Sequence, residues 1–315
     1  MYNMYNKGVL SILGRVYLNT KLFIGTFSII LLFALTTVPA DTLLSSATST
    51  LDQTKVNSYN EPINNHLLSL NVLTNSLENR LYGVASILEF ASNLPEMKSV
   101  PNVSLLNTTL ETLHGIPQDS DLQKRNIAQE ILSHYHEIAG IAFIMPNGDT
   151  YFMEPYALQS NQTKNNLAYR DYFKGSIATN DTYLGDIITS TSSGVKRAIV
   201  AVPVFTEKNN GVLTGVLVGS IELGLLNKEL QSLDLSQGQR IVYVDSNDTK
   251  IADSDKRLFT NSSETFSNLK SFQNANEGKF GSIVEKVGQD NMLVTYYPME
   301  ALQNRWIVLW IQPIN

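Results

Sequence analysis

The sequence of 315 residues contains no cysteine, and only 17% of its residues are charged. The lack of cysteine excludes a disulfide scaffold, thiolate zinc sites, iron–sulfur clusters and cysteine nucleophiles. The formal net charge is −6, so the chain lacks the basic surface that nucleic-acid phosphates require, and we expect no nucleic-acid partner. What is present is a globular composition, because 43% of the residues are apolar and can form a core.

Acidic residues are missing from the first 40 positions, where the charged residues are Lys7, Arg15 and Lys21. The uncharged apolar stretch 22–40 would span roughly 28 Å as a helix, which is close to the thickness of the bilayer core. All three positive charges precede this stretch, so the positive-inside rule places them in the cytoplasm. We predict a cytoplasmic segment 1–21 and a transmembrane helix 22–40, which anchors a single-pass cell-membrane protein with its C-terminal domain extracellular.

A cleavable signal peptide is the alternative interpretation of the same stretch. Val38, Pro39 and Ala40 resemble the small residues that precede a cleavage site. The apolar run is longer than the ~7–15 residues of a usual signal core, and Pro39 is unfavourable next to a cut, so the pattern favours the anchor. Both interpretations export the rest of the chain, which has a net charge of −9.

From residue 42 to residue 91 the apolar residues recur every three or four positions, which is the period of a helix. We predict a long stalk helix over 41–95, in which Pro62 marks either a kink or a fresh start with Asn60 as its cap. Such a helix either carries information to or from the membrane, with a homodimer formed along it, or packs on its own domain.

The rest of the chain predicts a mixture of short helices and strands. Two helices over 104–137, joined by a polar turn at 115–120, precede an antiparallel meander with strands near 138–144, 150–153, 185–189, 197–205 and 213–222. The same order of elements returns in shorter form between residues 240 and 311. The simplest fold is therefore α+β, with one long N-terminal helix followed by two modules in tandem.

One ordered set of motifs is similar to a known family. Arg-Asp-Tyr-Phe-Lys-Gly at 170–175 is followed by Thr-Tyr-Leu-Gly-Asp at 182–186, Ser-Thr-Ser-Ser-Gly at 190–194, Ala-Val-Pro-Val-Phe at 201–205 and Gly-Val-Leu-Val-Gly at 215–219. This set resembles the double Cache domain of prokaryotic extracellular sensors, over roughly residues 42–312. The resemblance implies two PAS-like antiparallel-sheet modules, a membrane-distal one at 96–232 and a membrane-proximal one at 233–315. It also implies a small extracellular ligand in the distal module.

The resemblance further implies the residues that bind this ligand. Arg170 matches the family's arginine for a ligand carboxylate, a task that suits the planar fork of guanidinium. Tyr172 and Phe173 follow it as aromatic and positioning residues, and the implied lining residues are Tyr151, Tyr183 and Asp186. The alternatives are a helix-start role for Arg170, paired with Asp171 or a loop carbonyl, and core packing for Tyr151 and Phe173.

Ser220 is a departure from the pattern. Amino-acid-binding members carry an aspartate at the matching position, where it holds the ligand ammonium, and a serine cannot supply that charge. Unless Glu222 or Asp186 takes its place, an organic acid is favoured over an α-amino acid. Ser220 itself remains a predicted ligand-binding residue.

Two other patterns were weighed as metal sites and rejected. His134 and His136 point about 200° apart on a helix, so both cannot face one ion. Residues 245–249 begin like a calcium loop, but Lys250 and Lys256 stand where the loop needs glycine and glutamate, so a hairpin turn is expected. We expect no metal and no cofactor.

The leading hypothesis is a membrane-anchored extracellular sensory domain for signal transduction or chemotaxis, and not an enzyme. No phosphate-binding glycine loop, G-x-S-x-G elbow or Ser-His-Asp order is present, which leaves an exported hydrolase without a catalytic set. A surface structural or adhesion protein with a non-functional pocket is the alternative. Because the only cytoplasmic part expected is 1–21, we expect signalling through a separate partner protein, a role limited to ligand binding, or a chain that is a piece of a longer product.

Overall fold

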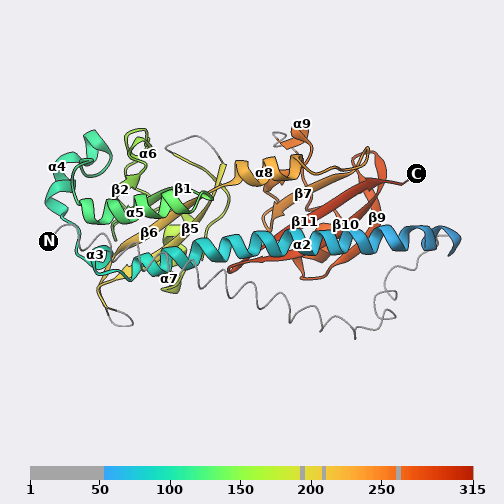
Figure 1. The fold of residues 1–315 in the computed structure, drawn as a ribbon, viewed down its shortest axis with the longest axis horizontal. Coiled ribbons are helices and arrows are strands. Elements are labelled where there is room, and N and C mark those ends of the chain that lie inside the picture. The colour runs from blue at the N-terminus through green and yellow to red at the C-terminus, as the bar shows by residue number, and fades with distance from the viewer. Residues whose placement is uncertain (1–52, 192–195, 208–210, 260–263, 315) are drawn as a thin grey trace. The chain divides into compact units, whose positions relative to one another are not determined.

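The computed structural model describes residues 53–191, 196–207, 211–259 and 264–314, and shows one long helix and two antiparallel sheets (Figure 1). The predicted segments 1–21 and 22–40 lie outside the described residues. Within the described ranges, none of the helices combines the length and the apolar character needed to cross a bilayer. The predicted α+β class, with an N-terminal helix and two PAS-like modules, is confirmed.

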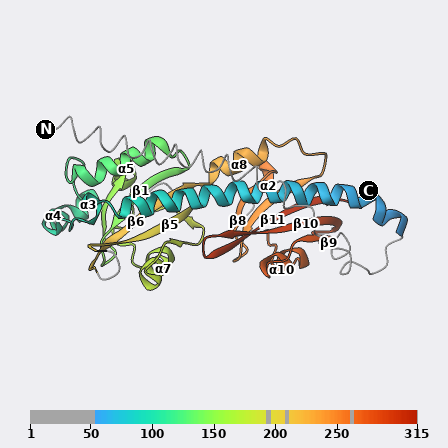
Figure 2. The same ribbon diagram turned by 60° about the horizontal axis from the view of Figure 1, so that its bottom comes forward.

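Helix α2 (Gln53–Ser92) runs for 40 residues along both sheets (Figures 1 and 2). The positions that the period of three and four marks as apolar are buried, among them Leu70, Leu81 and Leu88. The helix continues through Pro62, so the fresh start behind Asn60 was wrong. A proline removes one backbone donor, and a helix of this length keeps its hydrogen bonds on either side of the gap.

The first module (residues 95–231) begins with three helices, one more than the two predicted over 104–137, and the polar turn at 115–120 separates the last two. Asn102 caps the second of them, because its side chain accepts a hydrogen bond from the amide of Ser104. The helices are α3 (Pro95–Lys98), α4 (Val103–Leu113) and α5 (Leu122–His134). The elements that follow are β1 (Ile138–Ile144), β2 (Thr150–Glu154), α6 (Tyr156–Ser160), α7 (Asp171–Thr179), β3 (Tyr183–Leu184), β4 (Ile188–Thr189), β5 (Lys196–Phe205), β6 (Leu213–Glu222) and α8 (Leu223–Gln231).

The sheet of the first module has the order β2-β1-β6-β5-β3, with β4 also paired to β5. The chain leaves the sheet between β3 and β4, so the single strand predicted at 185–189 is instead two short ones. At this point the Gly185 amide donates to the carbonyl of Ile199, and the Asp186 amide donates to the carboxylate of Asp171. One face of the sheet packs against α7 and forms the core of the module.

The second module (residues 240–313) repeats the strand order of the first. Its elements are β7 (Arg240–Asp245), β8 (Lys250–Asp253), α9 (Lys256–Phe259), α10 (Lys270–Asn276), β9 (Gly281–Val287), β10 (Asp290–Ala301) and β11 (Asn304–Pro313). The sheet runs β8-β7-β11-β10-β9, so in both modules the second strand lies at one edge beside the first, and the last strand lies next to the first. The tandem repeat predicted from element order is therefore also a repeat of topology.

The turn at 245–249 joins β7 to β8 as the expected hairpin. Oδ1 of Asp245 accepts hydrogen bonds from the amides of both Asn247 and Thr249, so this one oxygen closes the turn. His134 ends α5, where its ring contacts Ser133 and the carbonyl of Glu130. In the part of the chain that the structure describes, no three histidine or acidic side chains gather in a way that would hold a metal ion.

Candidate ligand-binding site

The first module contains a cavity of about 60 Å³ between its sheet and the segment that leads into α7. Apolar side chains supply most of the wall, as is common for small-molecule sites, and they come from strands β1, β2, β4, β5 and β6, from α6 and from the loop before α7. These are Ile141, Ala142, Ile144, Met153, Leu158, Leu167, Ile188, Ile199 and Val218. Two arginines, Arg170 and Arg197, also line it.

Arg170 precedes the first residue of α7 in an extended conformation, with φ −69° and ψ 140°, which directs it to the cavity wall. Its Nη2 donates to the carbonyl of Thr189 over 3.2 Å, and its guanidinium lies 4.9 Å from the ring centre of Tyr169. Nε makes no hydrogen bond. Of the two alternative partners expected for Arg170, the loop carbonyl is therefore observed. The Asp171 carboxylate accepts a hydrogen bond from the Asp186 amide. Arg170 keeps donor capacity for a ligand.

Arg197 lies on β5, opposite Glu222 on β6, and only 7% of the residue is exposed. Its Nη1 is 3.0 Å from the Glu222 Oε2, and its Nε makes no hydrogen bond. Sequence reasoning missed this residue. The signal was present, because Arg197 opens a nearly continuous apolar strand, and a charge in such a strand needs a partner.

The two aromatic residues after Arg170 have different positions. Tyr172 lines the cavity and is buried, and burial raises the pKa of its hydroxyl, which stays neutral at physiological pH. Phe173 is buried in the core cluster and does not line the cavity. Tyr183 also packs against that core, where its ring meets the backbone of Gly175.

Tyr151 and Asp186 lie away from the cavity wall. The Tyr151 hydroxyl donates to Asp121 and accepts from the Asn102 amide, both over 3.0 Å, and burial raises the pKa of Tyr151 to about 12. Asp186 accepts a hydrogen bond from the side-chain nitrogen of Asn247, in the second module, over 2.9 Å. Its pKa is raised by burial and by the neighbouring Asp171 carboxylate.

Ser220 lines the cavity from β6, between Gly140 on β1 and Ile199 on β5. Glu222 and Asp186, the two candidate substitutes for an aspartate at this position, have other partners. Glu222 pairs with Arg197 and accepts from the Gly224 amide at the start of α8, and Asp186 faces Asn247. Among the described residues that line the cavity there is therefore no carboxylate.

The segment 183–189 joins the cavity to the second module. At one end Ile188 lines the cavity and Thr189 accepts from Arg170. At the other end Leu184 makes hydrogen bonds to side chains of the turn between β10 and β11 through both its amide and its carbonyl. Segment 183–189 thus contacts both the cavity wall and the second module.

The two modules repeat one PAS-like topology, and the first contains a small, largely apolar cavity. The sequence matches the family model of the Cache domain over residues 52–315. The chain belongs to the Cache-domain family, as the ordered motifs predict. A comparison with characterised proteins by sequence finds no significant match.

Solved structures of chemoreceptor ligand-binding domains share the fold. The domain of the Pseudomonas fluorescens chemoreceptor CtaA, in complex with L-isoleucine, has a TM-score of 0.56 at 15% identity, over 83% of this chain and 97% of its own. The Pseudomonas aeruginosa amino-acid chemoreceptor PctC, in complex with GABA, gives 0.54 at 15% identity, over 78% and 98%. A Campylobacter jejuni chemoreceptor domain with L-norvaline gives 0.57 at 12% identity, over 84% and 96%.

Proposed function

We propose that this protein is a sensory receptor that binds a small carboxylate-bearing ligand, an organic acid or an amino-acid-like molecule, in the cavity of its first module. The observation that carries the proposal is Arg170, which lines an apolar cavity with a buried Nε that has no partner. A guanidinium in such surroundings favours a carboxylate, which accepts two parallel hydrogen bonds from it. The complexes of similar structures with isoleucine, norvaline and GABA support the same class of ligand.

The proposal places the two modules outside the cell, with residues 22–40 in the membrane and residues 1–21 in the cytoplasm. The charge pattern around 22–40 supports this orientation. The first module is then the membrane-distal one, since α2 leads from the anchor past the second module. Its role is to bind and signal, as in transduction or chemotaxis, and not to catalyse.

Signalling would pass along α2 or through segment 183–189 to a separate signalling protein. Leu68 and Val72 are each 61% exposed on α2, one turn apart, and provide an apolar surface for a second copy of the chain. An exposed apolar pair at this spacing is what a helix-to-helix dimer contact requires.

Isothermal titration calorimetry of the full chain in detergent micelles tests the binding site. Organic acids and amino acids of up to six carbons are titrated into the wild-type protein, Arg170→Ala and the control Arg257→Ala, whose side chain is 89% exposed. We expect at least one ligand that binds wild type and the control alike, and Arg170→Ala at least about tenfold more weakly. A ligand that binds Arg170→Ala with unchanged affinity would overturn the site, and no binding at all would favour the adhesion alternative.

A further inference from the structure

We propose that the cavity selects small organic acids that lack an ammonium group, and that Arg197 is a second anion-binding residue beside Arg170. This inference rests on the proposed function, because it concerns the same cavity. It adds the chemical class of the ligand, and it excludes the α-amino acids that similar receptors bind.

Both arginines contact the same short strand, β4, although Arg170 precedes α7 and Arg197 lies on β5. Arg170 donates to the carbonyl of Thr189 on β4, and the backbone of Arg197 on β5 is paired with Ile188, the neighbouring residue of β4. Arg170 and Arg197 therefore flank one end of the cavity, which both of them line. A single small anion at this end has a guanidinium on each side.

Arg197 has unused capacity for that anion. Only 7% of Arg197 is exposed, and its Nε has no hydrogen-bond acceptor. Glu222 balances the charge of Arg197 from one side but shares its carboxylate with the Gly224 amide. A buried donor without a partner is unfavourable, and a ligand oxygen would supply the missing acceptor.

An ammonium group would find no partner in the same cavity. Ser220 presents only a neutral hydroxyl to the cavity wall, and the described lining residues include no Asp or Glu. Residues 192–195, which follow lining residue Thr191, read Ser-Ser-Gly-Val and contribute no acid to the sequence. A cation beside two guanidinium groups and no carboxylate would lose its hydration without compensation.

The volume limits the size of the acid. About 60 Å³ is less than half of the roughly 150 Å³ in which an engineered protein cavity holds benzene. We therefore expect the occupant to be a small acid with a short carbon chain. Its short carbon chain would lie against Ile141, Ile199 and Val218, and an oxo or hydroxyl oxygen next to the carboxylate would reach the second arginine.

Three acids with the same carbon skeleton test the inference, because pyruvate, L-lactate and L-alanine differ only in the group at the second carbon. They are titrated, with propionate and GABA, into the full chain in detergent micelles by calorimetry. We expect pyruvate, L-lactate or propionate to bind at least about tenfold more tightly than L-alanine. Arg197→Met should weaken that binding at least about tenfold, while the exposed control Arg257→Met leaves it unchanged.

A gain of function provides the complementary variant. Ser220→Asp installs a carboxylate at the cavity wall and should reverse the preference, so that L-alanine binds more tightly than pyruvate. Circular dichroism checks folding of each variant, and Arg197→Lys, which keeps the charge but not the fork, replaces Arg197→Met if that protein does not fold.

The outcomes separate this inference from the function on which it rests. The inference is wrong if wild type binds L-alanine as tightly as the best of the other acids. It is also wrong if Arg197→Met and Arg197→Lys both bind that best acid as tightly as wild type does. In either case, weaker binding by Arg170→Ala would still support the site. If none of the five compounds binds wild type, the inference is wrong, whereas the proposed function fails only if none of the acids of up to six carbons binds either.

Discussion

The side chain of Gln303 holds both backbone polar groups of Leu184. Its Oε1 accepts from the Leu184 amide over 3.0 Å, and its Nε2 donates to the Leu184 carbonyl over 2.6 Å. Gln303 belongs to the second module and Leu184 to the first, so one amide side chain takes the place of a neighbouring strand. Asn304 adds a further bond to the same carbonyl, over 2.7 Å.

Gln303→Ala should loosen this junction without disturbing the cavity. Two hydrogen bonds are lost, each contributing about 1 kcal/mol, so the free energy of unfolding should fall by about 1–3 kcal/mol. Hydrogen exchange should accelerate at the Leu184 amide, as followed by mass spectrometry of peptides that cover 183–189. Gln273→Ala, which removes an exposed bond to the Ser267 carbonyl, is the matched control. Unchanged exchange at 183–189 in Gln303→Ala would show that the Gln303 side chain does not hold Leu184 in place.

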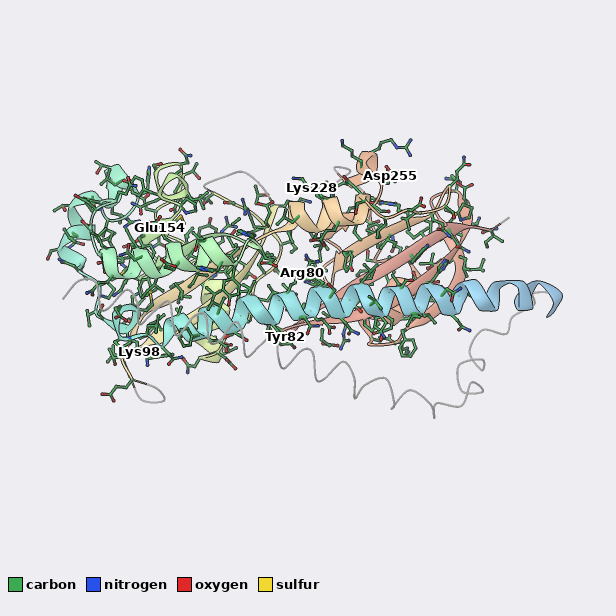
Figure 3. The ribbon with its side chains drawn as sticks, viewed as in Figure 1. Arg80, Tyr82, Lys98, Glu154, Lys228 and Asp255 are labelled. Atoms are coloured by element: carbon green, nitrogen blue, oxygen red, sulfur yellow. The ribbon has the colours of Figure 1, made fainter. Side chains whose placement is uncertain are left out.

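Arg125 and Glu154 form a buried ion pair that holds α5 on β2, with Arg125 Nη1 2.5 Å from Glu154 Oε1 (Figure 3 labels Glu154). Arg125 is fully buried and also donates to the carbonyls of Ile116 and Pro117. Arg125→Met leaves Glu154 buried without its partner and should destabilise the protein by about 3–5 kcal/mol in urea unfolding.

The surface pair of Arg80 and Glu229 is the control for that experiment, because both residues are ion-paired at 2.7 Å but more than a quarter exposed (Figure 3). Arg80→Met should cost no more than about 1 kcal/mol. Equal losses for the two variants would contradict the larger contribution expected of the buried pair.

Acid should destabilise the contact between α2 and β11 through His66. His66 stacks on Trp310 with ring centres 4.1 Å apart, and burial lowers its pKa from the usual 6.5. The unfolded chain then binds a proton at higher pH than the folded one, so the stability that His66 contributes is present above about pH 6.5 and is lost as the pH falls below it. His66→Phe keeps the stacking and should reduce the drop in melting temperature between pH 7.5 and pH 5. An identical drop in the variant and the wild type would exclude His66 as the cause.

Gly175→Ala should disrupt the packing of α7 on β3. A Cβ at this position would lie 2.5 Å from the ring of Tyr183, so the ring must move, at a cost of about 1–3 kcal/mol. Gly83→Ala offers an opposite control within α2, because a Cβ there meets nothing within 4 Å and alanine favours a helix by about 0.5–1 kcal/mol. The melting temperature should fall for the first variant and rise for the second.

The periodic patterns predicted most of the fold, because burial on one face leaves a regular trace in the sequence. Residues 138–144 and 240–245 formed strands as expected, and the helix near 265–275 formed as α10. The passage through Pro62 was not predictable from local preference, because a proline inside a helix usually ends or kinks it, whereas α2 is helical from Gln53 to Ser92. The break between β3 and β4 depends on Asp171 and Ile199, which are distant in sequence.

The candidate site was harder to predict than the fold. Arg170, Tyr172 and Ser220 line the cavity together, whereas Tyr151 and Asp186 bond to other parts of the chain. A motif fixes which residues are present but not the direction in which each side chain points. Arg197 was missed because nothing in its own segment shows that β5 passes the cavity, a fact set by the pairing of β4 and β5.

The contacts of α2 have a consequence for biosynthesis. The Tyr297 hydroxyl bonds Asn71 across 226 positions of the sequence, and the Glu300 amide bonds Glu78 across 222. The helix therefore emerges from the ribosome long before the strands that cover it, with Leu70, Leu77 and Leu81 still in water. Such non-local pairing slows folding and leaves apolar surface open to aggregation. The second sheet is completed only after the rest of the chain has been synthesised, so a truncation within β10 or β11 should leave part of the apolar face of α2 uncovered and prone to aggregation.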